Sequence, residues 1–159
     1  MSGKMHKITP FLWFDNQAEE AMNFYLSVFK NSKAGELRRY PSGAFLTASF
    51  EIEGQPFIAL NGGPHYKLTP AISLYVDCED QAEVDALWGK LSDGGEIHQC
   101  GWVTDKFGLT WQIIPSALGT MLQDKDAEKS QRVWKAMMEM RKIDIQRLRD
   151  AYDGAYQPA

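Results

Sequence analysis

The sequence repeats itself at an interval of 64 residues, and this repeat constrains the fold more than any other feature. Residues 8–12 (ITPFL) align with residues 72–76 (ISLYV), and residues 16–19 (NQAE) align with residues 80–83 (DQAE). Self-similarity at a fixed interval is typical of a structural unit that occurs more than once in a chain. We therefore expect two copies of one supersecondary unit.

Each copy carries the start signal of a helix. In NQAE and in DQAE, an Asn or Asp is followed three residues later by Glu, which is the spacing of a capping box. Apolar residues at helical spacing follow both segments. The first helix is expected to end near Asn31, and the second at Asp93-Gly94-Gly95, a strong C-terminal signal.

Strands are expected on both sides of each helix. Apolar and polar residues alternate over 72–77, which predicts a strand there, and the repeat places another over 8–14. Further strands are expected at 36–40, 45–53 and 57–61 in the first half and at 96–99, 101–104 and 109–115 in the second. Both halves thus follow the order β-α-β-β-β. The expected fold class is α+β, with two βαβββ modules forming a cup-shaped mixed sheet, plus C-terminal helices.

The chain length suits one domain, 1–159, built from a first module at 7–62, a second at 71–115 and a helical tail at 116–159. A segment rich in Gly and Pro, residues 62–70, would connect the modules. In the tail, Asp126 can cap a helix that runs to about Met140, and Asp144 can cap another. Apolar residues on one face of each helix are expected to pack on the body or on a second subunit.

Composition and charge exclude several classes of protein. No apolar run approaches the ~18–20 residues of a membrane-spanning helix, and the first residues lack the apolar core of a secretory signal. We expect a cytoplasmic protein with no membrane partner. The net charge is −4, and the tail intersperses eight basic with six acidic residues over 125–153, which argues against nucleic acid. Cys78 and Cys100 are too few for a disulfide framework, so reduced thiols are expected.

Four segments, ITPFLWFDNQAEEAMNFY, ALNGGPHY, GWVTDKFGLTWQIIP and MRKIDIQRLRDAY, resemble the PhnB-like branch of the vicinal oxygen chelate superfamily. This superfamily includes glyoxalase I, the fosfomycin and bleomycin resistance proteins and the extradiol dioxygenases. Members of the branch often carry the label 3-demethylubiquinone-9 3-methyltransferase. The resemblance covers about residues 7–153 and implies paired βαβββ modules, a cup-shaped cavity and a homodimer, often with exchanged modules.

The resemblance also implies where a divalent metal ion would bind. Its ligands would come from residues 8–10, from Ala71 or Ser73, and from Gln112, of which Gln112 alone is an ordinary ligand type. We therefore expect neither metal nor cofactor. A metal-dependent lyase, isomerase or dioxygenase-type enzyme that recruits His65 or His98 is the alternative. A methyltransferase is disfavoured because the glycine pairs at 62–63 and 94–95 form no GxGxG motif.

A pocket for a small organic ligand is expected on the side of the strands that faces away from the helices. Strand alternation, the repeat and the family position of Gln112 select Thr9, Phe11, Trp13, Ser73, Tyr75 and Gln112. Asn61, at the end of the fourth strand, and Trp102, just before the Asp105 turn, complete the set. Aromatic walls with a few polar groups are typical of such pockets. The residues identify no catalytic group, and whether the protein is an enzyme stays open. Asp105 is expected to shape the turn before the last strand.

Overall fold

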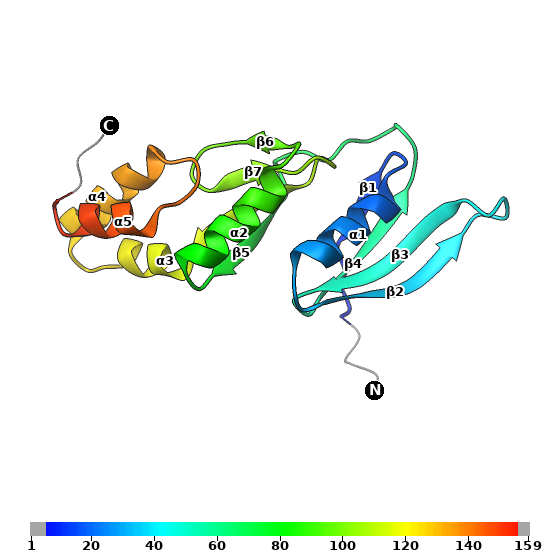
Figure 1. Ribbon diagram of the computed structural model, residues 1–159, viewed down its shortest axis with the longest axis horizontal. Coiled ribbons are helices and arrows are strands. Elements are labelled where there is room, and N and C mark those ends of the chain that lie inside the picture. Colours follow the sequence, from blue (N-terminus) through cyan, green and yellow to red (C-terminus); the bar gives the residue numbers. More distant parts are fainter. Residues whose placement is uncertain (1–5, 156–159) are drawn as a thin grey trace. The chain divides into compact units, whose positions relative to one another are not determined.

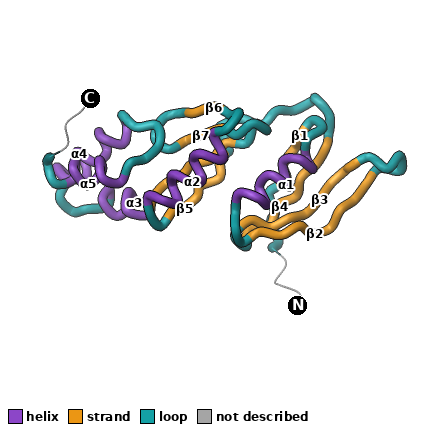
Figure 2. The backbone as a smooth tube through the Cα atoms, in the orientation of Figure 1, coloured by secondary structure: helices purple, strands orange, loops and turns teal. Residues whose placement is uncertain are grey.

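A computed structural model describes residues 6–155 of the chain. The chain divides into two compact units, Met1–Leu68 and Thr69–Ala159, and the boundary lies inside the connecting segment that the sequence predicts. Each unit places a helix against a four-stranded mixed sheet (Figures 1 and 2). The α+β class and the duplicated βαβββ order are thereby confirmed.

The first unit follows the predicted order of elements. These are β1 (Phe11–Phe14), α1 (Ala18–Val28), β2 (Ser32–Arg39), β3 (Phe45–Ile52) and β4 (Gln55–Asn61). The strand order is β1-β4-β3-β2, with β1 parallel to β4 and the other pairs antiparallel. The first strand is shorter than the predicted 8–14, since pairing with β4 begins at Phe11.

The helix α1 covers one face of this sheet. Leu12, Phe14 and Phe50 are buried on that face together with Tyr25 of α1, whose ring stacks 6.4 Å from the ring of Phe50. Because side chains alternate along a strand, Phe11 and its neighbours at odd positions lie on the opposite, free face. The repeat therefore predicts correctly that Phe11 lies on the face opposite the helix.

The predicted capping box at the start of the first helix is wrong. The helix begins at Ala18, and Gln17, the residue before it, makes no side-chain cap. Instead, the amide of Ala18 donates a hydrogen bond of 2.8 Å to Oδ1 of Asn61, at the end of β4. A residue 43 positions away thus satisfies a backbone donor that the local sequence leaves open.

The second unit repeats the arrangement. Its elements are β5 (Ser73–Cys78), α2 (Gln81–Ser92), β6 (Glu96–Ile97), β7 (Trp102–Thr104) and β8 (Thr110–Pro115), in strand order β5-β8-β7-β6. Here β5 is parallel to β8. Val103, Trp111 and Ile113 are buried beneath α2. Ile72, which the sequence assigns to the helix-facing set, precedes the strand and is 74% exposed, so that assignment is wrong.

The capping signal of the second helix is confirmed in its main part. Oδ1 of Asp80 accepts a hydrogen bond of 2.9 Å from the amide of Glu83. The Glu83 carboxylate reaches back to the amide of Glu79, one residue earlier than a capping box requires. The helix ends at Ser92, and Gly94 adopts a positive φ of 72°, as the predicted stop signal requires.

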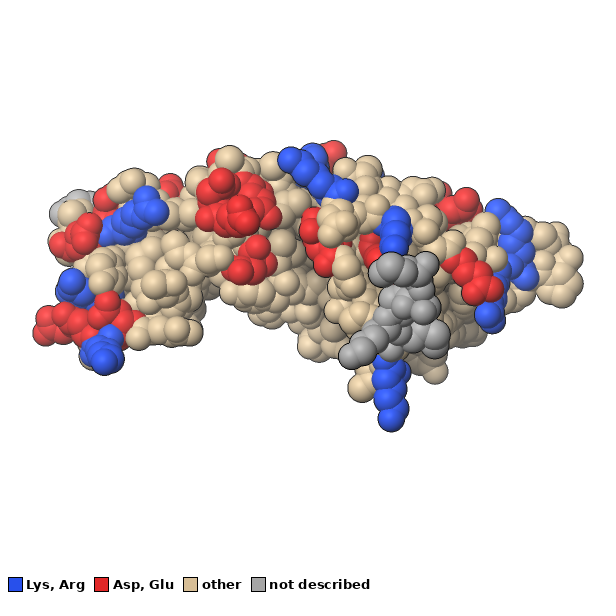
Figure 3. Space-filling model, turned by 90° about the horizontal axis from the view of Figure 1, so that it is seen from below, with Lys and Arg blue, Asp and Glu red and all other residues tan. Residues whose placement is uncertain are grey.

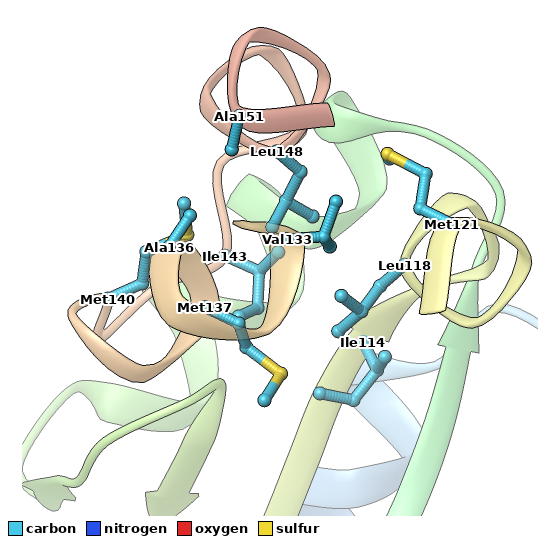
Figure 4. Packing of buried hydrophobic residues seen from close by; sticks show 10 residues of the cluster. All are labelled: Ile114, Leu118, Met121, Val133, Ala136, Met137, Met140, Ile143, Leu148 and Ala151. Atoms are coloured by element: carbon cyan, nitrogen blue, oxygen red, sulfur yellow. The ribbon is translucent and has the colours of Figure 1, made fainter. Parts of the chain in front are cut away.

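Three helices follow the second sheet within the same unit, namely α3 (Ser116–Leu122), α4 (Ala127–Met138) and α5 (Ile145–Tyr152). Asp126 and Asp144 cap α4 and α5 as predicted. The sequence did not predict α3, which begins directly after β8 without a side-chain cap. The three helices enclose a core of their own with the end of β8 (Figure 4); its members are Ile114, Leu118, Met121, Val133, Ala136, Met137, Met140, Ile143, Leu148 and Ala151.

Hydrogen bonds fasten the tail to the second module. The amides of Cys100 and Gly101 donate to the carbonyls of Met140 and Arg141 at 2.8 and 2.7 Å. From α2, the Gln81 side chain bonds the backbone of residues 143 and 145 with both of its polar atoms. The helices from 116 onward are therefore an integral part of this unit. No helix among residues 6–155 is long and apolar enough to cross a membrane.

Candidate functional site

The free face of the second sheet brings together four of the predicted site residues. Tyr75 pairs with Gln112 across β5 and β8, and Trp102 pairs with Gln112 across β7 and β8. The three side chains therefore form one row across three neighbouring strands, on the face opposite α2. Ser73 lies on the same face, two residues before Tyr75.

The amide of Gln112 is held in place within this row. Its Nε2 donates a hydrogen bond of 2.9 Å to Oγ of Ser73, which leaves Oε1 directed elsewhere. Within the part of the chain that the structure describes, no donor bonds Oε1. An amide that is half-buried and fixed through its nitrogen presents its oxygen as an acceptor for an O–H or N–H group.

A chain of polar groups runs beside the row. His98 Nε2 lies 2.7 Å from Thr104 Oγ1, which lies 2.8 Å from Oγ1 of the fully buried Thr110. Thr110 pairs with Ser73 in the strand register. Sequence reasoning missed both threonines as part of this face, although their alternation with Val103 and Trp111 could have placed them on it.

The free face carries no fixed positive charge on its four strands. The side chains that alternate onto it from β5 to β8 are Ser73, Tyr75, Asp77, Glu96, Trp102, Thr104, Thr110, Gln112 and Ile114. Burial, followed by the nearby negative charge of Asp77, raises the pKa of Tyr75, so its hydroxyl stays protonated at neutral pH. Asp77 in turn accepts a hydrogen bond of 2.7 Å from Ser116.

The first unit places its predicted residues differently. Phe11 is 54% exposed on the free face of its sheet, and Thr9 lies just before that strand, half-buried. The segment that follows β4 packs against Trp13. Its indole donates to the Gly63 carbonyl at 2.9 Å, and its ring meets that of Tyr66 edge-on at 5.0 Å.

Gly62 makes this arrangement of Trp13 feasible. A Cβ atom at position 62 would lie 2.4 Å from the Trp13 ring, so any side chain there would displace it. The remaining predicted residue, Asn61, pairs with Phe14 and therefore lies on the face that α1 covers. There its side chain holds the N-terminus of α1. A contact between Asn61 and a ligand stays a prediction.

Asp105 shapes the turn between β7 and β8, as the sequence predicts. Its buried carboxylate accepts hydrogen bonds from the amides of Phe107 and Leu109 through Oδ1. Oδ2 accepts a bond of 2.9 Å from the indole of Trp111. This clamp fixes the pairing of the two strands that carry Trp102 and Gln112.

The positions that the resemblance assigns to a metal ion do not fit one. Thr9, Ser73 and Gln112 offer two hydroxyls and an amide, and the last two bond to each other. A stable divalent site needs imidazole or carboxylate donors. Within residues 6–155, no group of three or more His, Cys, Asp or Glu side chains is placed to hold a metal ion. Both cysteines are free thiols.

Charge on the tail gives no sign of a basic patch in the view of Figure 3. Over the C-terminal helices, Lys and Arg side chains alternate with Asp and Glu. Two of these basic side chains have partners within the second unit: Lys142 pairs with Asp85 of α2 at 2.9 Å, and Lys129 lies over the ring of Tyr152 at 4.7 Å. The hydrogen bond from Tyr152 lowers the pKa of Asp124, while Asp124 raises the pKa of Tyr152.

Comparison with known proteins identifies the family. The profile of the 3-demethylubiquinone-9 3-methyltransferase family matches residues 6–114. A comparison with curated proteins gives no match. Among solved structures, a PhnB protein from Bacillus cereus, described as a putative 3-demethylubiquinone-9 3-methyltransferase, is 36% identical, with a TM-score of 0.66; the match covers 70% of this chain and 100% of that one.

Two more distant structures were also matched. Protein PA1353 from Pseudomonas aeruginosa is 19% identical with a TM-score of 0.57, over 70% of this chain and 98% of that one, and shows the fold alone. The fosfomycin resistance protein FosX from Listeria monocytogenes, in complex with Mn(II) and sulfate, is 16% identical with a TM-score of 0.47, over 70% and 87%. The chain belongs to the 3-demethylubiquinone-9 3-methyltransferase (PhnB-like) family.

Proposed function

We propose that the free face of the second sheet binds a small, uncharged organic ligand that carries an aromatic ring and a hydroxyl or N–H group. The observation that carries this proposal is the row Tyr75–Gln112–Trp102. Two aromatic side chains flank one oriented amide, and this combination suits a flat, mostly apolar molecule with a single polar substituent.

Each side chain of the row has its own proposed role in ligand binding. The rings of Tyr75 and Trp102 supply apolar contact area and stacking. Gln112, whose nitrogen is held by Ser73, accepts a hydrogen bond from the ligand through Oε1. The lack of Lys and Arg on the strands of this face gives no basis for preferring a phosphate or carboxylate.

The ligand would bind without a metal ion, because the positions that the superfamily uses offer only neutral donors. A metal-dependent enzyme with His65 or His98 as ligands remains the alternative from the enzyme class. It would be supported if a chelator abolished an activity that Mn²⁺ or Zn²⁺ then restored. Methyl transfer is suggested by the family description and stays disfavoured, because the chain has no GxGxG motif.

Three further predictions belong to this proposal. Thr9, Phe11 and Trp13 of the first module are proposed as additional ligand contacts, on the strength of the repeat. A cup enclosed by the two modules would bring both sets together. A homodimer, with modules exchanged between chains or not, follows from the family resemblance.

Binding of 4-methylphenol tests the proposal. We expect saturable binding by calorimetry or by quenching of tryptophan fluorescence. Removing the acceptor in Gln112→Leu, or the ring in Tyr75→Ala, should weaken binding about tenfold, since a net hydrogen bond or an aromatic contact contributes about 1–1.5 kcal/mol. Tyr40→Ala is the control, because Tyr40 is a similarly exposed tyrosine of the first unit. Equal affinity in Tyr75→Ala, Gln112→Leu and Tyr40→Ala would refute the assignment.

A further inference from the structure

The C-terminal helices cover one end of the proposed ligand face. Ile114 lies two residues beyond Gln112 on β8, so both side chains point to the same side of the sheet, about 7 Å apart along the strand. Gln112 is half-buried, whereas Ile114 is only 5% exposed. The face is therefore more closely covered at the level of Ile114 than at the level of Gln112.

The covering groups belong to the tail. Ile114 is part of the buried cluster that α3, α4 and α5 enclose. In Figure 4 the Met137 side chain extends from α4 toward the strand that carries Ile114, while Met121 lies on α3 farther from that strand. A side chain at position 101 would collide with Ile114 and Ile143, each within about 3 Å of an added Cβ, which shows how closely the packing is filled at this end.

This cover is fixed rather than movable. The amides of Cys100 and Gly101 bond the chain between α4 and α5, and Gln81 bonds the same segment from α2. Lys142 and Asp85 add an ion pair at 2.9 Å. Because these contacts come from two separate parts of the module, the tail acts as a wall and not as a lid.

Most of the wall lies beyond the segment that the family model matches. The family match ends at residue 114, just before α3 begins. The match to the Bacillus cereus relative covers 100% of that chain but 70% of this one. This chain therefore carries residues for which that relative has no counterpart. A feature that borders the ligand face and lies beyond the matched segment is well placed to adjust ligand choice in this protein.

We propose that the tail, packed on Ile114 at the end of β8, limits the length of the ligand, with Ile114 and Met137 as the residues that set the limit. The inference rests on the proposed binding face. A ring held at Tyr75–Gln112–Trp102 would direct an apolar substituent toward Ile114, since Ser73, Thr104 and Thr110 make the other end polar. At the Ile114 end, the strands place one polar side chain on the face, Asp77, which pairs with Ile114 across β5 and β8 and accepts a hydrogen bond from Ser116. The substituent then meets the wall after a few carbons. The protein selects short aromatic ligands and rejects those with long alkyl chains.

A homologous series of 4-alkylphenols, from methyl to hexyl, measures this limit. In the unsubstituted protein, affinity should rise about fourfold for each methylene that fits, and then stop rising once the chain reaches the wall. Ile114→Ala and Met137→Ala each remove part of the wall. We expect both variants to move the break in the series, which is the alkyl chain length at which affinity stops rising, by about two carbons. Deleting buried groups leaves space that a ligand can fill.

Met121→Ala is the matched control. Met121 belongs to the same cluster and is as deeply buried as Met137, with 9% and 8% exposure, but it is not directed at Ile114. The Met121→Ala variant should be less stable than the unsubstituted protein, but its affinity should stop rising at the same alkyl chain length. Ile114→Val removes a single methyl group and should move the break by about one carbon, which keeps the test valid if the Ala variants fail to fold.

The two proposals fail in distinguishable ways. If 4-methylphenol does not bind the unsubstituted protein, the binding face itself is wrong, and the length limit falls with it. If 4-methylphenol binds all variants and the break stays in place in Ile114→Val, Ile114→Ala and Met137→Ala, the binding face stands and the wall is refuted. A break that moves equally in Met121→Ala would also refute it, because the effect would then be general loosening.

Discussion

Substituting Asp105 with Asn tests whether one buried carboxylate sets the geometry of the candidate site. Asp105 is 3% exposed and accepts bonds from two turn amides and from the Trp111 indole. Asn has the same shape and can keep the amide bonds through its oxygen. Its NH₂ group, however, would face the indole N–H, so two donors would meet where a donor and an acceptor met before.

The expected loss of stability follows from these contacts. An unsatisfied buried donor costs about 1–3 kcal/mol, and bonds to a charged acceptor are about twice as strong as neutral ones. Asp105→Asn should therefore lower the free energy of unfolding of the second unit by about 3 kcal/mol. Asp93→Asn, which changes an exposed carboxylate of the same unit, should change it by less than about 0.5 kcal/mol.

Urea unfolding followed by tryptophan fluorescence is a suitable assay, since four of the five tryptophans lie in the second unit. A double-mutant cycle with Trp111→Phe isolates the indole bond. When Trp111→Phe is already present, Asp105→Asn should cost about 1–2 kcal/mol less than in the unsubstituted protein. A loss below about 0.5 kcal/mol, or an equal loss with and without Trp111→Phe, would refute the reasoning.

Two further predictions concern the second unit. Burial raises the pKa of Cys78 to about 12 from its usual 9.0, with Glu83 adding to the effect, so folding favours the protonated thiol. Stability should therefore be lost progressively as the pH rises from about 9 toward 12, and Cys78→Ala should flatten that part of a plot of urea midpoint against pH. Gln81→Ala removes two hydrogen bonds to residues 143 and 145 and should cost about 1–3 kcal/mol. Faster amide exchange over 141–146 would accompany that loss, whereas Gln146→Ala should leave exchange unchanged; unaltered exchange in Gln81→Ala would contradict the role of this bond in fixing the tail.

The features that sequence reasoning predicted correctly are those with a local physical cause. Asp80, Asp126 and Asp144 each cap a helix through an amide two or three residues away, so the signal and its effect lie in one short segment. The free face of the second sheet is similar in part. Alternation along one predicted strand puts Ser73 and Tyr75 on one side, whereas Gln112 is assigned to that side from the family resemblance.

The features that it missed depend on residues far apart in the chain. Nothing near Ala18 indicates that Asn61 will bond its amide from the end of another strand. The helix α3 has no cap and only seven residues, and it is stabilised by contact with α4 and α5 rather than by its own sequence. The wall at Ile114 has the same origin, because its residues belong to a cluster that only the folded unit assembles.

The first turns of α1 and α2 are capped by residues at different distances along the chain, and this difference has a consequence for the order of folding. The start of α2 is completed by Asp80, three residues from the amide it bonds, so this helix can form its first turn as soon as the segment collapses. The start of α1 waits for Asn61, which closes a loop of 43 residues. At matching positions of the duplicated chain, the capping contact thus spans many residues in the first half and few in the second. The second half is therefore expected to nucleate earlier than the first.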